Sequence, residues 1–150
     1  MFQNVIDALL LNATRMGHGY AIAKHPEAKR IAKEKNIPIE VNPISNQVLG
    51  LVKDLRNHPV APLIQEGFPM VISADDPGLW DAKGLSYDYY SAFMALAGKT
   101  MNLKLLKKFV QNSLEYSTLK GDELSKCSAI VESRWASYMQ LFQPKINELF

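Results

Sequence analysis

Three side chains capable of acid, base or metal-binding chemistry follow short apolar segments of this sequence. His18 lies in "RMGHGY", and Asp75 and Asp76 are adjacent in "VISADDP". An imidazole exchanges protons near neutral pH, and a carboxylate is a ligand for divalent metal ions. Two neighbouring carboxylates repel each other, so the aspartate pair marks either a turn or the floor of a site. These residue types indicate a His/Asp site, with or without a metal ion. They do not identify a reaction.

The segments that precede these side chains are typical of strands in a parallel sheet. "TRMGHGY" is a short extended piece, "IPIEVNP" is β-branched, and "FPMVIS" is an unbroken apolar run of the kind buried on both faces. Helical patterns alternate with them, which predicts βα units. We expect helices over residues 3–11, 25–36, 45–57, 87–98 and 102–116, a turn and helix over 58–67, and a long helix from about residue 122. Ser45 is expected to cap the third helix and Gly98 to end the one over 87–98.

The number of strands limits the fold. A three-stranded parallel sheet leaves two bare edges, which folded proteins avoid. A complete (β/α)8 barrel needs about 250 residues, and this chain has 150. We therefore predict an α/β fold that is the C-terminal part of a (β/α)8 TIM barrel, with about three strands and their helices, incomplete as a barrel.

Sites in parallel α/β folds gather at the carboxyl ends of the strands. His18, Asp75 and Asp76 would then face one another, with Asn42 and Ser45 following the middle strand. The glycines on both sides of His18 would allow a positive φ or a close approach to a ligand. By itself "DDP" is more often a turn and "GHG" a loop, but their joint placement at strand ends favours a site.

Composition excludes several classes of protein. Hydrophobic residues make up 47% and charged residues 21%, as in a soluble globular domain. A net charge of +2, from 17 basic and 15 acidic residues, gives no case for a nucleic-acid or membrane partner. No apolar stretch is long enough for a membrane span. The single cysteine, Cys127, excludes an internal disulfide and a thiolate metal cluster.

Several motifs in order carry a family resemblance. "LLLNATRMGHGYAIAKHP", "IPIEVNPISNQVL", "LRNHPVAPLI" and "PMVISADDP…AKGLSYDYY" resemble the C-terminal part of the adenosine deaminases, most of all the secreted adenosine deaminase-related growth factor subfamily. The resemblance weakens after about residue 119. It implies that residues 1–150 are the C-terminal part of a single catalytic barrel domain whose N-terminal half is absent.

The resemblance implies a zinc hydrolase that converts adenosine, and 2'-deoxyadenosine, to inosine or its deoxy form and ammonia. Asp75 matches the aspartate that binds the single zinc ion, Asp76 the aspartate that contacts the purine, and His18 the histidine that accepts a proton from the attacking water. Zinc lowers the pKa of a bound water from about 15.7 toward 7, which explains the need for a metal.

The family's other zinc ligands and its proton donor are expected outside this chain. Its "HxH" pair and "HAGE" motif should lie upstream of Met1, so we expect this piece alone to be inactive. The two remaining histidines, His25 and His58, each precede a proline, and we interpret both as structural or exposed. Asn42 stands where the family commonly has cysteine, which is a mild sign of divergence.

Localisation and partners follow from the same resemblance. A secreted protein is expected, and "NAT" at Asn12 is a sequon for N-glycosylation. Adenosine is the expected substrate, with a second copy of the complete protein and a cell-surface receptor as further candidate partners. Two alternatives remain open: a non-catalytic growth-factor-like or receptor-binding relative that keeps the fold, and a short interaction module.

Overall fold

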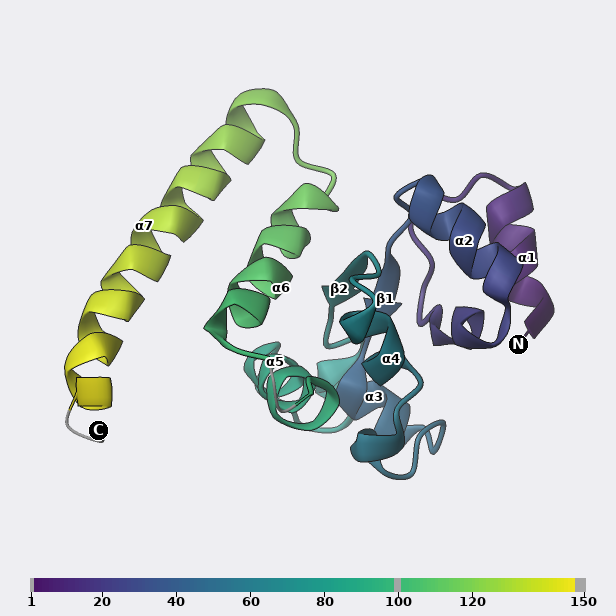
Figure 1. Ribbon diagram of the computed structural model, residues 1–150, viewed down its shortest axis with the longest axis horizontal. Helices are drawn as coiled ribbons and strands as arrows, with labels where there is room; N and C mark the ends of the chain where they lie inside the picture. The colour runs from purple at the N-terminus through teal and green to yellow at the C-terminus, as the bar shows by residue number, and fades with distance from the viewer. Residues whose placement is uncertain (1, 99–100, 148–150) are drawn as a thin grey trace.

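The structure is a computed structural model that describes residues 2–98 and 101–147 (Figure 1). Helices and two strands alternate in its first half, and helices alone form its second half. In chain order the elements are α1 (Phe2–Leu10), η1 (Tyr20–Lys24), α2 (Pro26–Glu34), β1 (Ile39–Val41), α3 (Pro43–Val48), η2 (Leu55–Asn57), α4 (Val60–Gln65), β2 (Met70–Ile72), η3 (Pro77–Leu79), α5 (Ser86–Ser91), η4 (Ala92–Leu96), α6 (Leu103–Glu115) and α7 (Gly121–Asn147).

The sheet is parallel and open. β1 pairs with β2 in the register Ile39↔Met70 and Val41↔Ile72. The expected first strand is reduced to one bridge between Met16 and Ile39. The extended backbone stops there because His18 adopts a left-handed φ of 54° two residues later. The described residues therefore hold two strands and a bridged segment, in place of three strands.

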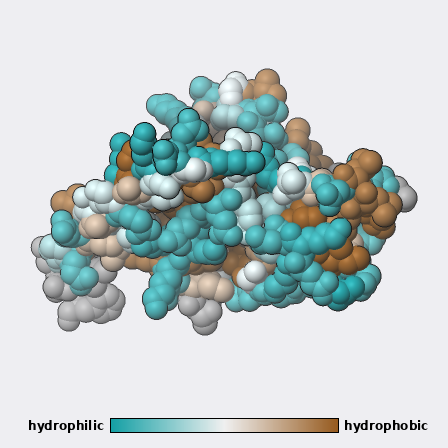
Figure 2. All heavy atoms as spheres, turned by 90° about the horizontal axis from the view of Figure 1, so that it is seen from above, coloured by the Kyte–Doolittle hydropathy of each residue, from teal (hydrophilic) through white to brown (hydrophobic). Residues whose placement is uncertain are grey.

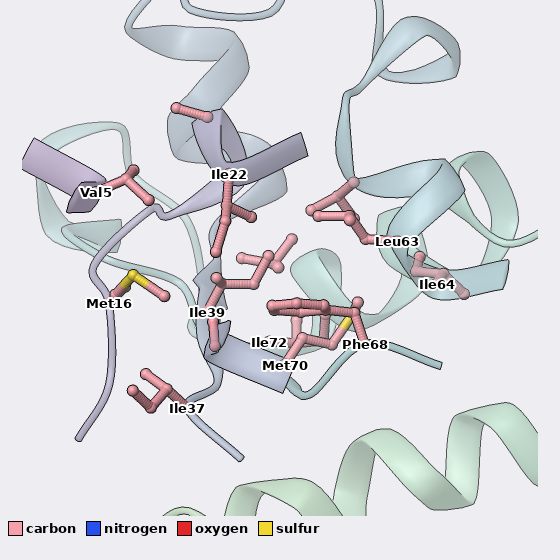
Figure 3. Close-up of a cluster of buried hydrophobic side chains, with 14 of the residues drawn as sticks. Val5, Met16, Ile22, Ile37, Ile39, Leu63, Ile64, Phe68, Met70 and Ile72 are labelled. Atoms are coloured by element: carbon pink, nitrogen blue, oxygen red, sulfur yellow. The ribbon is translucent and has the colours of Figure 1, made fainter. Parts of the chain in front are cut away.

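The core lies between the sheet and the helices of the first half. Figure 3 shows the side chain of Ile39 among those of Ile22, Met70 and Ile72. All four are at most 2% exposed. Burying an aliphatic side chain of this size contributes roughly 1.5–3 kcal/mol, so this small cluster holds β1 and β2 against η1.

Two expected helices differ from the observed ones. The helix predicted over residues 45–57 begins earlier and ends at Val48, because Pro43 supplies a helical φ at its first turn and Gly50 turns left-handed with φ 68°. Ser45 is therefore inside α3 and is not its cap. The helix predicted over 87–98 is confirmed in part, since α5 passes into a π-helical turn, η4, which is followed by Ala97 and not by Gly98.

The two long helices lie on one side of the sheet. α6 packs on β2, where the Asn112 side-chain amide donates to the main-chain oxygen of Met70 at 2.8 Å. α7 packs along α6 and lies farther from the sheet (Figure 1). Among the described residues, no helix has the length and apolar character that crossing a membrane requires.

Apolar surface remains exposed at the opposite end of the molecule. Figure 2 shows apolar side chains gathered at its right-hand end, where α1 lies. Leu10 and Leu11 are 79% and 82% exposed, and Ile6 is exposed beside them. Contiguous exposed apolar residues mark surfaces that pack against another part of a protein.

We expect the isolated chain of 150 residues to self-associate, because its sheet has open edges and α1 leaves apolar side chains uncovered. Analytical ultracentrifugation with thermal unfolding checks this. A monomer with one sharp, reversible two-state transition would contradict the expectation.

Candidate functional site

The loop between Met16 and η1 presents His18. Both His18 and Gly19 have left-handed φ values, 54° and 30°. A side chain at position 19 would place its Cβ 2.6 Å from Ile39 Cγ2, so only glycine fits there. At Gly17 the nearest atom to such a Cβ is Glu40 Oε2 at 3.7 Å, and its φ is not left-handed. Of the two glycines flanking His18, only Gly19 is required by the backbone.

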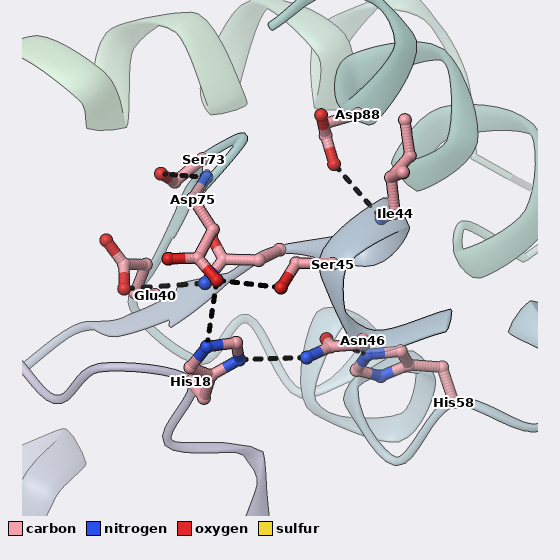
Figure 4. A network of polar contacts seen from close by, with 10 residues as sticks. His18, Glu40, Ile44, Ser45, Asn46, His58, Ser73, Asp75 and Asp88 are labelled. Carbon is pink, nitrogen blue, oxygen red and sulfur yellow. Dashed lines mark hydrogen bonds and ion pairs between the residues drawn. The ribbon is translucent and has the colours of Figure 1, made fainter. Parts of the chain in front are cut away.

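Asp75 meets His18 at the carboxyl ends of the strands. The Nε2 atom of His18 lies 3.3 Å from Asp75 Oδ2, and the hydroxyl of Ser45 donates to the same oxygen at 2.7 Å (Figure 4). The His18 and Asp75 side chains are 34% and 26% exposed, so the pair is partly shielded and still open to solvent. The predicted meeting of these two residues is confirmed.

The backbone of Asp75 is held in an unusual conformation. Its φ is 57°, and its main-chain N–H donates to Ser73 Oγ at 3.3 Å. A left-handed non-glycine residue costs free energy and persists only where its surroundings hold it in place. Both His18 and Asp75 share this feature, which is common at functional sites.

Asp76 lies apart from the pair. It precedes η3, its side chain is exposed, and it makes no hydrogen bond to His18 or Asp75 among the described residues. The expectation that all three face one another is therefore met by two of them. Asp75 has a left-handed φ of 57° and Asp76 a φ of −109°, so the backbone turns between the two aspartates.

A second layer of polar side chains lies behind His18. Asn46 Nδ2 is 2.8 Å from His18 Nδ1, and Asn46 Oδ1 is 2.8 Å from His58 Nε2 (Figure 4). The main-chain N–H of Val60 donates to His58 Nδ1 at 3.0 Å. Asn46 and His58 thus link α3 and the start of α4 to His18.

His58 is almost completely buried, as is Asn46. It is 1% exposed, and the edge of its ring meets Tyr20 with centroids 5.3 Å apart. Burial lowers the pKa of His58 to about 4. Its ring is therefore neutral at physiological pH, and the interpretation of His58 as structural holds.

Ser45 and Asn46 both lie on α3, and the first turn of this helix is held in place by a side chain of α5. Asp88 of α5 is fully buried, and its Oδ1 accepts the main-chain N–H of Ile44 at 3.1 Å. Burial raises the pKa of Asp88, while the bond from Ile44 opposes that rise. Asn42 precedes α3 and is also buried; its Nδ2 donates to Glu40 Oε2 at 3.4 Å.

One oxygen of the Asp75 carboxylate is open to a metal ion. Asp75 Oδ2 already accepts from Ser45, whereas Oδ1 has no hydrogen-bond partner within the described part of the chain. That open carboxylate oxygen suits a zinc ligand. In residues 2–98 and 101–147 no group of three or more histidine, cysteine or acidic residues could hold a metal ion. Asp75 thus fits as one ligand of a metal site that the described residues do not complete.

Sequence reasoning did not name Asn46. It placed Ser45 after the middle strand without linking it to Asp75, and it interpreted His58 as structural or exposed without linking it to His18. Ser45 was expected at a helix terminus, but the early start of α3 at Pro43 turns Ser45 and Asn46 toward the site. The available signal was the Asn-Pro pair at 42 and 43, since proline favours the first helical position. His58 carried no such signal, because its burial depends on Tyr20 and α4.

We predict that Gly19→Ala lowers the free energy of unfolding by about 2 kcal/mol or more, because the added Cβ collides with Ile39 and the φ is left-handed. Gly17→Ala is the matched control and should change it by less than about 0.5 kcal/mol. Urea unfolding of the complete protein measures both. Equal effects of the two variants would be inconsistent with this account of the loop.

Protonation of His58 should make the protein sensitive to acid. The pKa is about 6.5 in an unfolded chain and about 4 when folded, so below pH 6.5 the unfolded state binds more protons. Stability should therefore fall as pH drops from about 6.5 to about 4, by at most on the order of 3 kcal/mol. Thermal unfolding against pH should show this slope, and His58→Gln should flatten it in that window. An unchanged slope in the variant would rule the effect out.

The amino-acid sequence of this chain matches a known protein family and several known proteins. The profile of the family described as "Adenosine deaminase" matches residues 2–133. "Adenosine deaminase 2" of Homo sapiens is 53% identical over 137 residues, which are 91% of this chain and 27% of that protein. "Adenosine deaminase" of Phlebotomus duboscqi is 44% identical over 147 residues, 97% of this chain and 28% of that protein. The chain thus spans about a quarter of the length of these relatives.

Solved structures give the same fold. An adenine deaminase of Arthrobacter aurescens superposes with a TM-score of 0.78 at 19% identity, over 91% of this chain and 40% of that one. An amidohydrolase of Burkholderia ambifaria with bound zinc gives 0.79 at 23% identity, over 95% and 39%. These matches confirm the expected fold, part of a (β/α)8 barrel whose sheet is not closed. Together with the profile match they show that this chain belongs to the adenosine deaminase family.

Proposed function

We propose that the complete protein containing this chain is a zinc-dependent hydrolase that converts adenosine, and 2'-deoxyadenosine, to inosine or its deoxy form and ammonia. One observation carries the proposal: His18 Nε2 and Ser45 Oγ converge on Asp75 Oδ2 at the carboxyl ends of two parallel strands. Membership of the adenosine deaminase family supports the choice of substrate. In this proposal residues 1–150 are the C-terminal part of one catalytic domain and are inactive alone.

Asp75 is the proposed zinc ligand. Ser45 occupies Oδ2 and leaves Oδ1 available to a metal ion. When bound, zinc would supply Lewis-acid chemistry that lowers the pKa of water from about 15.7 toward 7. A zinc-bound amidohydrolase among the structures of the same fold supports this assignment. The remaining ligands would come from residues outside this chain.

In this proposal His18 and Asp75 are the two side chains that exchange a proton with the attacking water. Water adds to C6 of the purine, and the amino group leaves as ammonia. The resemblance gives His18 the role of proton acceptor, and the Asp75 carboxylate that faces its Nε2 is the other group able to take this proton. Asp76 is exposed beside the pair and is the proposed contact to the purine ring. Because purine N7 only accepts, a direct bond to it requires a protonated carboxyl group.

Secretion is part of the proposal. The resemblance to a secreted subfamily supports it, and Asn12 and Thr14 of the sequon are exposed directly after α1. A second copy of the protein and a receptor stay candidate partners.

Three variants separate the proposed roles in a complete deaminase, whose N-terminal part can be taken from human adenosine deaminase 2. Asp75→Ala should abolish tight zinc binding and turnover. His18→Ala should keep zinc and lose at least about 10²-fold in turnover. Asp76→Ala should keep zinc, raise KM for adenosine and slow the reaction. Metal content and inosine formation are measured for each variant. Zinc lost in His18→Ala and kept in Asp75→Ala would show that the roles are assigned to the wrong residues.

A further inference from the structure

A series of hydrogen bonds connects the main chain of α4 to His18. The first donor in the series determines which atom donates and which accepts in every later bond. The Val60 N–H can only donate, so His58 Nδ1 accepts it and carries no proton. A neutral His58 therefore has its hydrogen on Nε2. That nitrogen lies 2.8 Å from Asn46 Oδ1 and donates to it.

The orientation of Asn46 then fixes His18. With Oδ1 turned to His58, the amide nitrogen of Asn46 faces His18 Nδ1 at 2.8 Å and donates to it. His18 Nδ1 is thus an acceptor, and the hydrogen of a neutral His18 ring is on Nε2, which faces Asp75 Oδ2. The opposite tautomer would require both Asn46 and His58 to reverse, and it would direct an N–H of His58 at the N–H of Val60.

We propose that Asn46 and His58 are positioning residues that hold the ring of His18 in the Nε2–H tautomer and direct that hydrogen toward Asp75. Neither residue reaches the reacting atoms, and both act through His18. Both side chains are shielded from water, since Asn46 is fully buried and His58 is 1% exposed. An unpaired polar group there would cost about 1–3 kcal/mol, so the bonds are kept.

If the proposed function holds, this tautomer of His18 decides how the attacking water is oriented. His18 presents a hydrogen to the corner it shares with Asp75, so it would orient the attacking water as a donor. The hydrogen-bond acceptors beside this hydrogen are then the oxygens of the Asp75 carboxylate. For His18 to act as the proton acceptor, the whole chain of bonds would have to reverse, and the N–H of Val60 opposes that reversal.

The tautomer is measured directly by 15N–1H correlation spectra of the histidine rings in the complete protein, with His18 assigned from His18→Gln. Wild-type His18 should carry its hydrogen on Nε2. In Asn46→Asp the carboxylate can only accept, so the hydrogen of His18 should move to Nδ1. Asn112→Asp is the matched control: Asn112 is a buried asparagine bonded to Met70 and has no link to His18, so the wild-type tautomer should remain.

A second pair of variants covers the case in which Asn46→Asp does not fold. His58→Gln keeps an amide donor for Asn46 and should preserve the tautomer of His18, whereas His58→Leu removes the donor and should leave a mixture. In turnover, Asn46→Asp and His58→Leu should each lose about 10- to 100-fold, with zinc content unchanged and His58→Gln near wild type.

The outcomes separate this inference from the proposed function. A wild-type His18 with its hydrogen on Nδ1, or a tautomer unmoved in both Asn46→Asp and His58→Leu, would overturn the inference even in an active deaminase. A wild-type protein that shows the expected tautomer and does not deaminate adenosine would overturn the proposed function and leave the positioning roles intact.

Discussion

The parallel pairing of β1 with β2 is the constraint on which the rest of the site depends. Val41 and Ile72 are aligned, and the N–H of Ser73 continues the ladder to the oxygen of Val41 at 2.9 Å. This register brings the two strand ends to one level. As a result α3, which follows β1, and the turn at Asp75, which follows β2, start side by side. A slip of one residue in β1 would bring Glu40 to the buried position of Ile39 or Val41. It would also separate Ser45 from Asp75.

Stability and function use the same contacts in this arrangement. The fully buried Asp88 and Asn46 are polar groups that a structure optimised only for stability would avoid, because each needs exact partners. Asp88 holds the start of α3, and Asn46 extends from α3 to His18. The strained backbone at His18 and Asp75 is held by these bonds and by the packing of Gly19 on Ile39. The fold thus supports two unfavourable conformations at the place where the chemistry is proposed.

Much of the fold could be predicted from the sequence because local patterns dominate it. Pro26 and the apolar spacing in α2, the unbroken run of β2 and the stripe of α6 each indicate their own element. The meeting of His18 with Asp75 followed from the rule that strand ends gather in parallel sheets. The start of α3 was signalled locally by Pro43, and that signal was overlooked. The reduced first strand and the burial of His58 against Tyr20 depend on non-local packing. No local pattern carries that information.

The central claim is that Asp75 is a zinc ligand in a site completed by residues outside this chain. The most direct measurement is a crystal structure of the complete protein with anomalous diffraction at the zinc edge. The account predicts an anomalous peak about 2.0–2.2 Å from an Asp75 carboxylate oxygen, with Ser45 still bonded to Oδ2 and His18 not coordinated. A peak coordinated by His18 and not by Asp75, or a site with zinc bound away from both, would contradict it.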